Sequence, residues 1–341
     1  MSSEDNALPA HTARQGDRQV PRATSIRLET VLALVSALTY TGASLALREL
    51  AIPNDIGWAV WVTANKAVPA AIVAWALVGW RAARGLPALP PRRLLVPLLL
   101  VGLIMQYGGN LMFQWSLSLS GLAITVPIVF ATLVCSGAWL GRQIVGDSIT
   151  NRMRIAIGVM IVSIVLLSTG VDVAVASVAG RASTLTLVLA VATAMVSGFS
   201  YGAVGVMIRK LVAGGLSVSA SLVMFSTAGA VFLGLHSVIQ FGPDVLWTTS
   251  SAQWRLMLTA GVCNAIAFFS LAVAMKRASV TYLNVLIASQ SAMCAAAGVL
   301  LFHEPFTLAA GVGCLLTVIG LTIVDDSRND HYEEPPSGDR R

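Results

Sequence analysis

The chain has 341 residues, of which 56% are hydrophobic and 11% are charged, and its mean hydropathy is +0.78. This apolar content exceeds what a soluble core of the same size could bury, so the composition excludes a soluble globular protein and predicts an all-α integral membrane protein. The net charge of +6 does not indicate nucleic-acid binding, because the basic residues lie in short segments between apolar runs and form no single stripe.

Ten apolar segments follow one another along the chain, and each approaches the length of about 20 residues that a helix needs to span a bilayer. The two ends of the chain, residues 1–28 and 326–341, are polar, and we expect them to form disordered cytoplasmic tails. We expect transmembrane helices at residues 30–47, 58–80, 94–115, 122–141, 154–171, 184–208, 217–240, 256–275, 279–302 and 306–324.

The basic residues predict how these helices are oriented. If the amino terminus is cytoplasmic, the segments that face the cytoplasm hold 18 of the 22 lysines and arginines. Cytoplasmic loops of membrane proteins carry such an excess of positive charge. The distribution therefore predicts an even number of spans, with both termini in the cytoplasm, in a multi-pass protein of the plasma (inner) membrane.

The chain contains an internal repeat. Residues 36–50, SALTYTGASLALREL, align without a gap to residues 197–211, SGFSYGAVGVMIRKL, so that Tyr40 pairs with Tyr201. Residues 110–117, NLMFQWSL, match residues 264–271, NAIAFFSL, at a similar offset. We therefore expect two five-helix repeats, at residues 29–172 and 183–325.

An odd number of helices in each repeat predicts that the second repeat crosses the membrane in the opposite sense. Asp147 in GDSIT and Glu304 in HEPFT occupy matching positions of the two repeats, so Asp147 is expected on the cytoplasmic side and Glu304 on the outer side. Inverted repeats are typical of secondary carriers, because exchanging the conformations of the two halves opens the protein to one side and then to the other.

Several of these features resemble the EamA-type units of the drug/metabolite transporter superfamily. They are Lys66 in a proline-containing second helix, the short turn after Ser-Leu between the third and fourth helices, and LLFHEPFTLAAGVGCLLTVIGL at residues 300–321. The resemblance covers residues 30–325 and implies a ten-helix inner-membrane carrier with a central cavity. The chain departs from the family pattern at Asp147, where glutamate is usual, and at Lys66, where many members have arginine.

Lys66 is the only charged side chain deep inside a predicted span, about 12 Å along the helix from Trp58 at 1.5 Å per residue. A lysine at that depth costs about 2.5 to 3.5 kcal/mol on insertion scales, so such residues face a cavity or a partner. The alternative is a structural role, in which the ammonium group reaches a backbone carbonyl. A cavity role would favour an anionic or carboxylate-bearing substrate.

Other polar side chains are predicted at similar depth, and they either line the cavity or form hydrogen bonds between helices. With Lys66 they form the predicted substrate-binding set, which contains Tyr40, Asn110, Tyr201, Asn264 and Tyr282. Asp147 and Glu304 each begin a corner before a helix, where a carboxylate caps free amide groups or contributes to a gate.

Enzymatic activity is not expected, although GFSYG at residues 198–202 matches the G-x-S-x-G pattern of serine hydrolases. Ser200 is predicted in the interior of an apolar helix, whereas a nucleophilic serine needs a strand-to-helix turn. Gly198, Gly202, Gly311 and Gly313 are better explained as positions where helices pack closely. No metal-ligating or cofactor-binding pattern is present, so we expect neither a metal nor a cofactor.

The sequence therefore predicts a secondary transporter, acting as an exporter, exchanger or facilitator of a small metabolite by alternating access. An amino acid, another carboxylate-bearing metabolite and an amphipathic drug-like compound are all compatible substrates. The expected partners are this small-molecule substrate and the lipid bilayer, without nucleic acid, and a homodimer is left open. The alternative is a membrane scaffold or receptor built on the same duplicated bundle.

Overall fold

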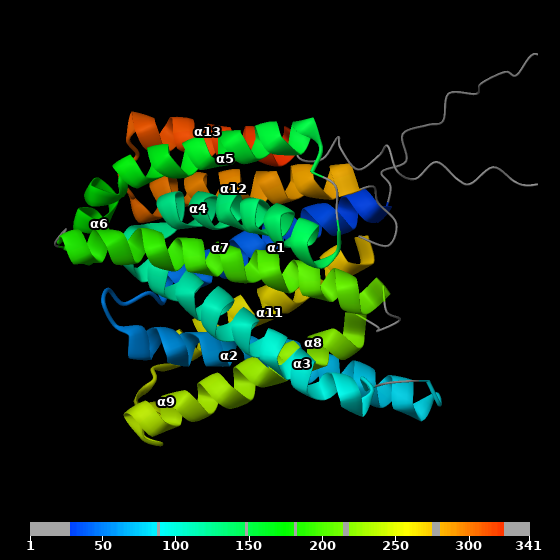
Figure 1. The fold of residues 1–341 in the computed structure, drawn as a ribbon. Helices are drawn as coiled ribbons and strands as arrows, with labels where there is room; N and C mark the ends of the chain where they lie inside the picture. The colour runs from blue at the N-terminus through cyan, green and yellow to red at the C-terminus, as the bar shows by residue number, and fades with distance from the viewer. Residues whose placement is uncertain are drawn as a thin grey trace, which may run out of the picture.

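The structure is a computed structural model that describes residues 28–86, 89–146, 149–180, 183–213, 218–274 and 280–323. These residues form a bundle of helices without a strand, as Figure 1 shows. The prediction of an all-α membrane protein is confirmed. The predicted tails, apart from Leu28, and the whole of Asp147 lie outside the described residues, as does the side chain of Tyr282.

The helices follow one another with short connections. In chain order they are α1 (Leu28–Glu49), α2 (Ile56–Ala83), α3 (Arg92–Leu103), the π-helix η1 (Ile104–Leu111), α4 (Met112–Ile144), α5 (Asn151–Thr169), α6 (Val171–Ala179), α7 (Thr184–Ala213), α8 (Val218–Ala228), the π-helix η2 (Gly229–Leu233), α9 (Gly234–Phe241), α10 (Val245–Thr248), α11 (Ser251–Ala274), α12 (Val280–Phe302) and α13 (Leu308–Ile323). The short helices α6 and α10 were not expected from the sequence.

Seven helices within the described residues are long and apolar enough to cross a membrane, and two shorter apolar helices, Ser289–Phe302 and Leu308–Ile323, follow them. The longest candidate runs for 53 residues, from Arg92 to Ile144. It is interrupted at Gly121, whose φ of 74° and ψ of −173° are not helical. A positive φ is readily adopted by glycine, so the helix breaks here, at the boundary between the predicted third and fourth spans.

The predicted third span is not a uniform α-helix. Residues Ile104–Leu111 form η1, and residues Gly229–Leu233 form η2 in the segment that follows α8. The two π-helices contact each other, and Gly229 of η2 lies against the side-chain amide of Gln106 in η1. Short π-helical segments occur often at functional sites, because the wider turn redirects side chains.

Helices from the first half of the chain pack against helices from the second half. α2 lies along α8, η2 and α9, and α5 lies along α13. Figure 1 shows the α5–α13 pair on one edge of the bundle and α2 with α9 on the opposite edge. Between these edges, α1 packs on α11, and α7 packs on η1 and α4.

Glycines make the closest of these contacts possible. Gly198 and Gly202 of α7 lie against the backbone of α4, and a Cβ at Gly202 would lie 2.8 Å from the Leu133 carbonyl oxygen. Gly313 of α13 contacts Leu167 of α5 in the same way, at 2.7 Å. Close helix packing is thus confirmed for these three glycines. It is wrong for Gly311, whose nearest neighbour is the ring of Phe306 in the connection before α13.

Candidate functional site

The buried lysine of α2 forms the centre of a polar cluster. Lys66 is 5% exposed, and its Nζ donates a hydrogen bond of 2.6 Å to Oδ1 of Asn110 in η1. On the other side of α2, Gly261 of α11 lies against the Lys66 carbonyl oxygen and the Pro69 ring, where a Cβ would be 2.8 Å and 2.7 Å away. The close approach of α11 covers this face of α2, and the lysine side chain extends toward η1.

Asn110 connects three helices through its side-chain amide. Its Oδ1 accepts a second hydrogen bond, of 2.9 Å, from the hydroxyl of Tyr201 in α7. Its Nδ2 donates to Oε1 of Gln106, one turn earlier, at 3.0 Å. Gln106 in turn donates through Nε2 to the carbonyl oxygen of Phe225 in α8, at 2.8 Å. The four side chains of Lys66, Asn110, Gln106 and Tyr201 thus form one continuous network, which we call the Lys66 network.

A pair of glycines in η1 brings α7 close enough to join the Lys66 network. A Cβ at Gly109 would lie 2.7 Å from the ring of Tyr201, and Gly108 lies against the hydroxyl of Ser200. Ser197 Oγ, one turn before Tyr201, donates a hydrogen bond of 2.9 Å to the Gly109 carbonyl oxygen. The glycine pair therefore positions the tyrosine hydroxyl on Asn110.

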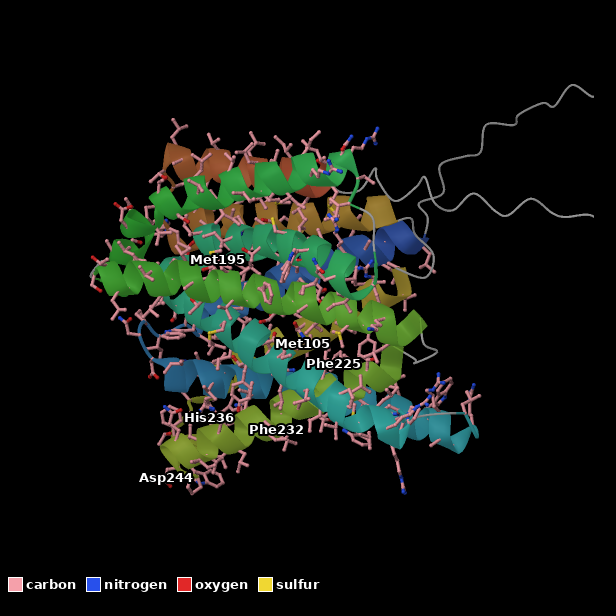
Figure 2. All side chains as sticks on the ribbon, viewed as in Figure 1. Met105, Met195, Phe225, Phe232, His236 and Asp244 are labelled. Atoms are coloured by element: carbon pink, nitrogen blue, oxygen red, sulfur yellow. The ribbon has the colours of Figure 1, made fainter. Side chains whose placement is uncertain are left out.

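The apolar surroundings of the Lys66 network hold it in place. Met105 of η1 packs in one cluster with Phe225, Leu98 and Val101. Figure 2 shows Met105 and Phe225 labelled where η1 approaches α8. Within the described part of the chain, no Asp or Glu forms an ion pair with Lys66, since the ion pair found there joins Arg48 to Glu304. The buried charge of Lys66 is therefore stabilised by an amide oxygen and not by a carboxylate.

The remaining predicted binding residues lie at different distances from this network. Tyr40 is half-buried in α1. Asn264 is half-buried in α11, and among the described residues it makes no hydrogen bond to the Lys66 network. Gln106 is among the polar residues that the sequence places at similar depth but is not in the predicted substrate-binding set, although its spacing of four residues from Asn110 places both on one side of a helix.

Glu304 forms a second buried cluster, near the end of α12. Its side chain is buried, and its Oε1 accepts hydrogen bonds from the backbone N–H of Leu122, at 2.9 Å, and from Arg48 Nε, at 2.8 Å. Its Oε2 accepts from the backbone N–H of Ala123, at 2.8 Å. The carboxylate thus joins α1, α4 and the connection between α12 and α13, and we call this arrangement the Glu304 junction.

The helix that Glu304 caps is not the one expected from the sequence. Its position before α13 predicts a cap on that helix, but the first turn of α13 is capped by Thr307, whose Oγ1 accepts from the Ala310 N–H at 3.1 Å. Glu304 caps instead the second segment of α4. The break at Gly121 leaves the next amide groups without intrahelical partners, and a carboxylate is a strong acceptor for them.

Close backbone contacts allow the carboxylate to reach these amides. Gly121 and Gly298 both lie directly against the Glu304 carboxylate, where a side chain on either residue would overlap it. The Glu304 N–H also donates to the Gly298 carbonyl oxygen, at 3.0 Å. The guanidinium group of Arg48 lies over the ring of Phe302, 5.3 Å from its centroid, which positions the arginine beside the acid.

Comparisons with known proteins give one family match, over the second part of the chain, and a likeness of fold. Residues 188–324 match the model of the EamA-like transporter family. One solved structure, described only as a crystal structure of a protein, aligns with a TM-score of 0.60 over 91% of this chain and 100% of that chain, at 17% identity. At this identity the likeness shows the fold alone. No curated protein matches the sequence. The family match includes Tyr201 and Glu304, whereas Lys66 and Asn110 precede it.

Proposed function

We propose that this chain, whose residues 188–324 match the EamA-like transporter family, carries a small anionic metabolite across the plasma membrane by alternating access. The observation that carries the proposal is Lys66, a buried ammonium group whose described neighbours include no carboxylate partner. A charge at this depth is costly unless it is paired. A substrate anion would supply the missing partner.

The arrangement of the Lys66 network would allow such an anion to bind and to leave again. Asn110 Oδ1 accepts from both Lys66 and Tyr201, so an incoming carboxylate would meet two donors that already point to one position. A carboxylate oxygen forms a stronger hydrogen bond with an ammonium group than a neutral amide oxygen does. The substrate would therefore displace Asn110 from Lys66, and Asn110 would return when the substrate leaves.

The helix pairing supports ten spans arranged as two inverted five-helix repeats. The segment Arg92–Ile144 is long enough for two of the spans, and α12 and α13 supply the last two. The second helix of the first repeat, α2, pairs with α8–η2–α9 of the second repeat, and the two fifth helices, α5 and α13, pair with each other. α1 packs on α11 while α7 packs on η1 and α4, so the first helix of each repeat contacts the third helix of the other.

The charges at the helix ends support cytoplasmic termini. Apart from Glu29 at the start of α1, the acidic residues of the described helices and their flanks lie at the ends that would then face outward, and basic residues predominate at the other ends. The outward group is Glu49, Asp55, Asp172, Asp244 and Glu304, and the cytoplasmic group is Arg81, Arg84, Arg92, Arg93, Arg142, Arg152, Arg154, Arg209 and Lys210.

The Glu304 junction would act as the outer gate of this carrier. Its carboxylate connects α1 and α4 of the first repeat to the α12–α13 connection of the second. In alternating access the two repeats move against each other, so a contact between them on the outer side stabilises the state that is closed to the outside. Loss of the Arg48–Glu304 ion pair would therefore favour the outward-open state.

The test is transport by purified protein in liposomes, using labelled carboxylates and amino acids. We expect Lys66→Ala to abolish transport and Lys66→Arg, which keeps the charge, to retain part of it. The control is Lys210→Ala, which removes an exposed lysine at the end of α7 and should leave transport unchanged. Equal transport in all four proteins would refute the role of Lys66. Failure to move any solute under any gradient would favour a scaffold or receptor.

A further inference from the structure

The end of α2 and the start of α3, which one short connection joins, carry exposed arginines on the side that we propose to be cytoplasmic. Arg84, Arg92 and Arg93 are exposed, and the guanidinium group of Arg84 lies 4.1 Å from the ring centroid of Trp80. The chain contains no Asp or Glu from Ile56 to Gly146. These arginines therefore have no acidic partner within their own part of the sequence.

The helices packed around these arginines do not supply a carboxylate either. α8 packs against both α2 and α3, and its sequence, VSASLVMFSTA, contains no charged residue. The nearby end of α7 carries Arg209 and Lys210, which are basic. Within the described residues, α7, α8 and the α2–α3 region therefore place no acidic side chain beside Arg84, Arg92 and Arg93.

Each of the two helices also has an exposed apolar stripe that leads to one of the arginines. On α3 and the start of η1, which continues it, Val96, Leu100 and Ile104 are 65%, 56% and 48% exposed, and they follow Arg92 at intervals of four residues. On α2, Ile72 and Trp80 are 64% and 50% exposed, and with Ala76 they lead at the same interval to Arg84. Residues four apart lie on one face of a helix, so each stripe is continuous.

We propose that these two stripes and their arginines form a binding site for an anionic phospholipid of the cytoplasmic leaflet. The phosphate group would bind Arg84, Arg92 and Arg93, and the acyl chains would lie along the apolar stripes. Guanidinium groups bind phosphate oxygens in pairs, and basic clusters next to a membrane span attract anionic headgroups. Tryptophan prefers the membrane interface, so Trp80 would hold Arg84 at headgroup depth.

The positive charge of the arginines favours an anionic phospholipid over a zwitterionic one at this site. A zwitterionic lipid would cover the apolar stripes equally well but would leave three arginines without a counter-charge. Each arginine near an anionic surface contributes enough attraction that three of them together should favour the anionic lipid about 100-fold. The proposal concerns the membrane around the protein, and it holds whichever solute the carrier moves.

The test is native mass spectrometry of the protein in bilayer nanodiscs of phosphatidylcholine with a minor fraction of phosphatidylglycerol. We expect retained phosphatidylglycerol to be strongly enriched over its bulk fraction for the native protein. The triple variant R84Q/R92Q/R93Q should lose this enrichment. The matched control is R142Q/R152Q/R154Q, which removes three arginines from the end of α4 and the start of α5 and should keep the enrichment.

A charge-conserving variant keeps the test decisive if the glutamine variant folds poorly. R84K/R92K/R93K preserves the positive charge, so we expect it to retain most of the enrichment. Enrichment that is equal in the native and triple-glutamine proteins would overturn the proposal. So would an equal loss in the triple-glutamine variant and the control, because selectivity would then follow the total cytoplasmic charge and not this site.

Discussion

Replacing Glu304 with glutamine should destabilise the protein far more than any other single neutralisation of an acid on the same face. The carboxylate accepts three hydrogen bonds, from Leu122 N–H, Ala123 N–H and Arg48 Nε, at 2.9, 2.8 and 2.8 Å. A glutamine has one acceptor oxygen in place of two, so its amide group must face at least one of these donors. It also leaves Arg48 without a counter-charge.

The expected loss of stability has two contributions, the loss of a helix cap and the loss of one partner of an ion pair. Loss of a cap on the second segment of α4 costs about 1 kcal/mol. Removing one partner of a buried ion pair costs about 3 to 5 kcal/mol, but the Arg48 side chain is 14% exposed against 2% for Glu304, so water reduces that cost. We expect a total of about 3 kcal/mol in the free energy of unfolding.

The assay is thermal unfolding in nanodiscs, followed by the helical circular dichroism signal. The control is Glu49→Gln, which makes the same chemical change at an exposed residue next to Arg48 and should shift stability by less than about 0.5 kcal/mol. A double variant separates the two terms. Because Arg48→Gln removes the uncompensated charge, Arg48→Gln with Glu304→Gln should be less destabilising than the sum of the single changes. Equal melting temperatures for Glu304→Gln and Glu49→Gln would refute the reasoning.

Two further predictions use matched positions in the same structure. Gly202→Val places a side chain against the α4 backbone, where a Cβ lies 2.8 Å from a carbonyl oxygen, and should lower the melting temperature, whereas Gly205→Val on the same helix meets nothing within 4 Å and should not. If both valine variants melt alike, α4 and α7 do not pack as described. Asn110→Leu removes the acceptor of Lys66 and should destabilise by about 3 kcal/mol or more, whereas Tyr201→Phe removes one hydrogen bond and should cost about 1 kcal/mol in the same assay. A smaller effect at Asn110 would show that Lys66 has another partner.

The overall class of the protein follows directly from its sequence, because the bilayer imposes local requirements. A spanning helix must satisfy its own backbone hydrogen bonds and be apolar over about 20 residues, and both properties can be seen without knowing the packing. The all-α membrane fold was predicted in this way and is confirmed. The resemblance to EamA-type units was based on sequence motifs, and the family match over residues 188–324 confirms it. The third span shows the limit, since nothing local distinguished η1 from an ordinary α-helix.

The candidate site was predictable only in part. Lys66 stands out because a charge in an apolar segment is costly wherever it points. Its partner did not stand out, because Asn110, Asn264 and the tyrosines are all polar residues at similar depth. The choice of Asn110 depends on the π-helical turn of η1 and on the contact between Gly109 and Tyr201, and both arise when helices distant in sequence pack together.

Glu304 shows which part of the candidate site follows from the sequence and which part depends on the tertiary structure. The sequence by itself determined that a carboxylate precedes the last helix, and capping chemistry determined that it would seek free amide groups. Only the tertiary structure decided which amides these are, since Leu122 lies 182 residues away. A hydrogen bond acts over about 3 Å, so the partner is set by the break at Gly121 and the close packing at Gly298, which no local property of residues 303–307 could reveal.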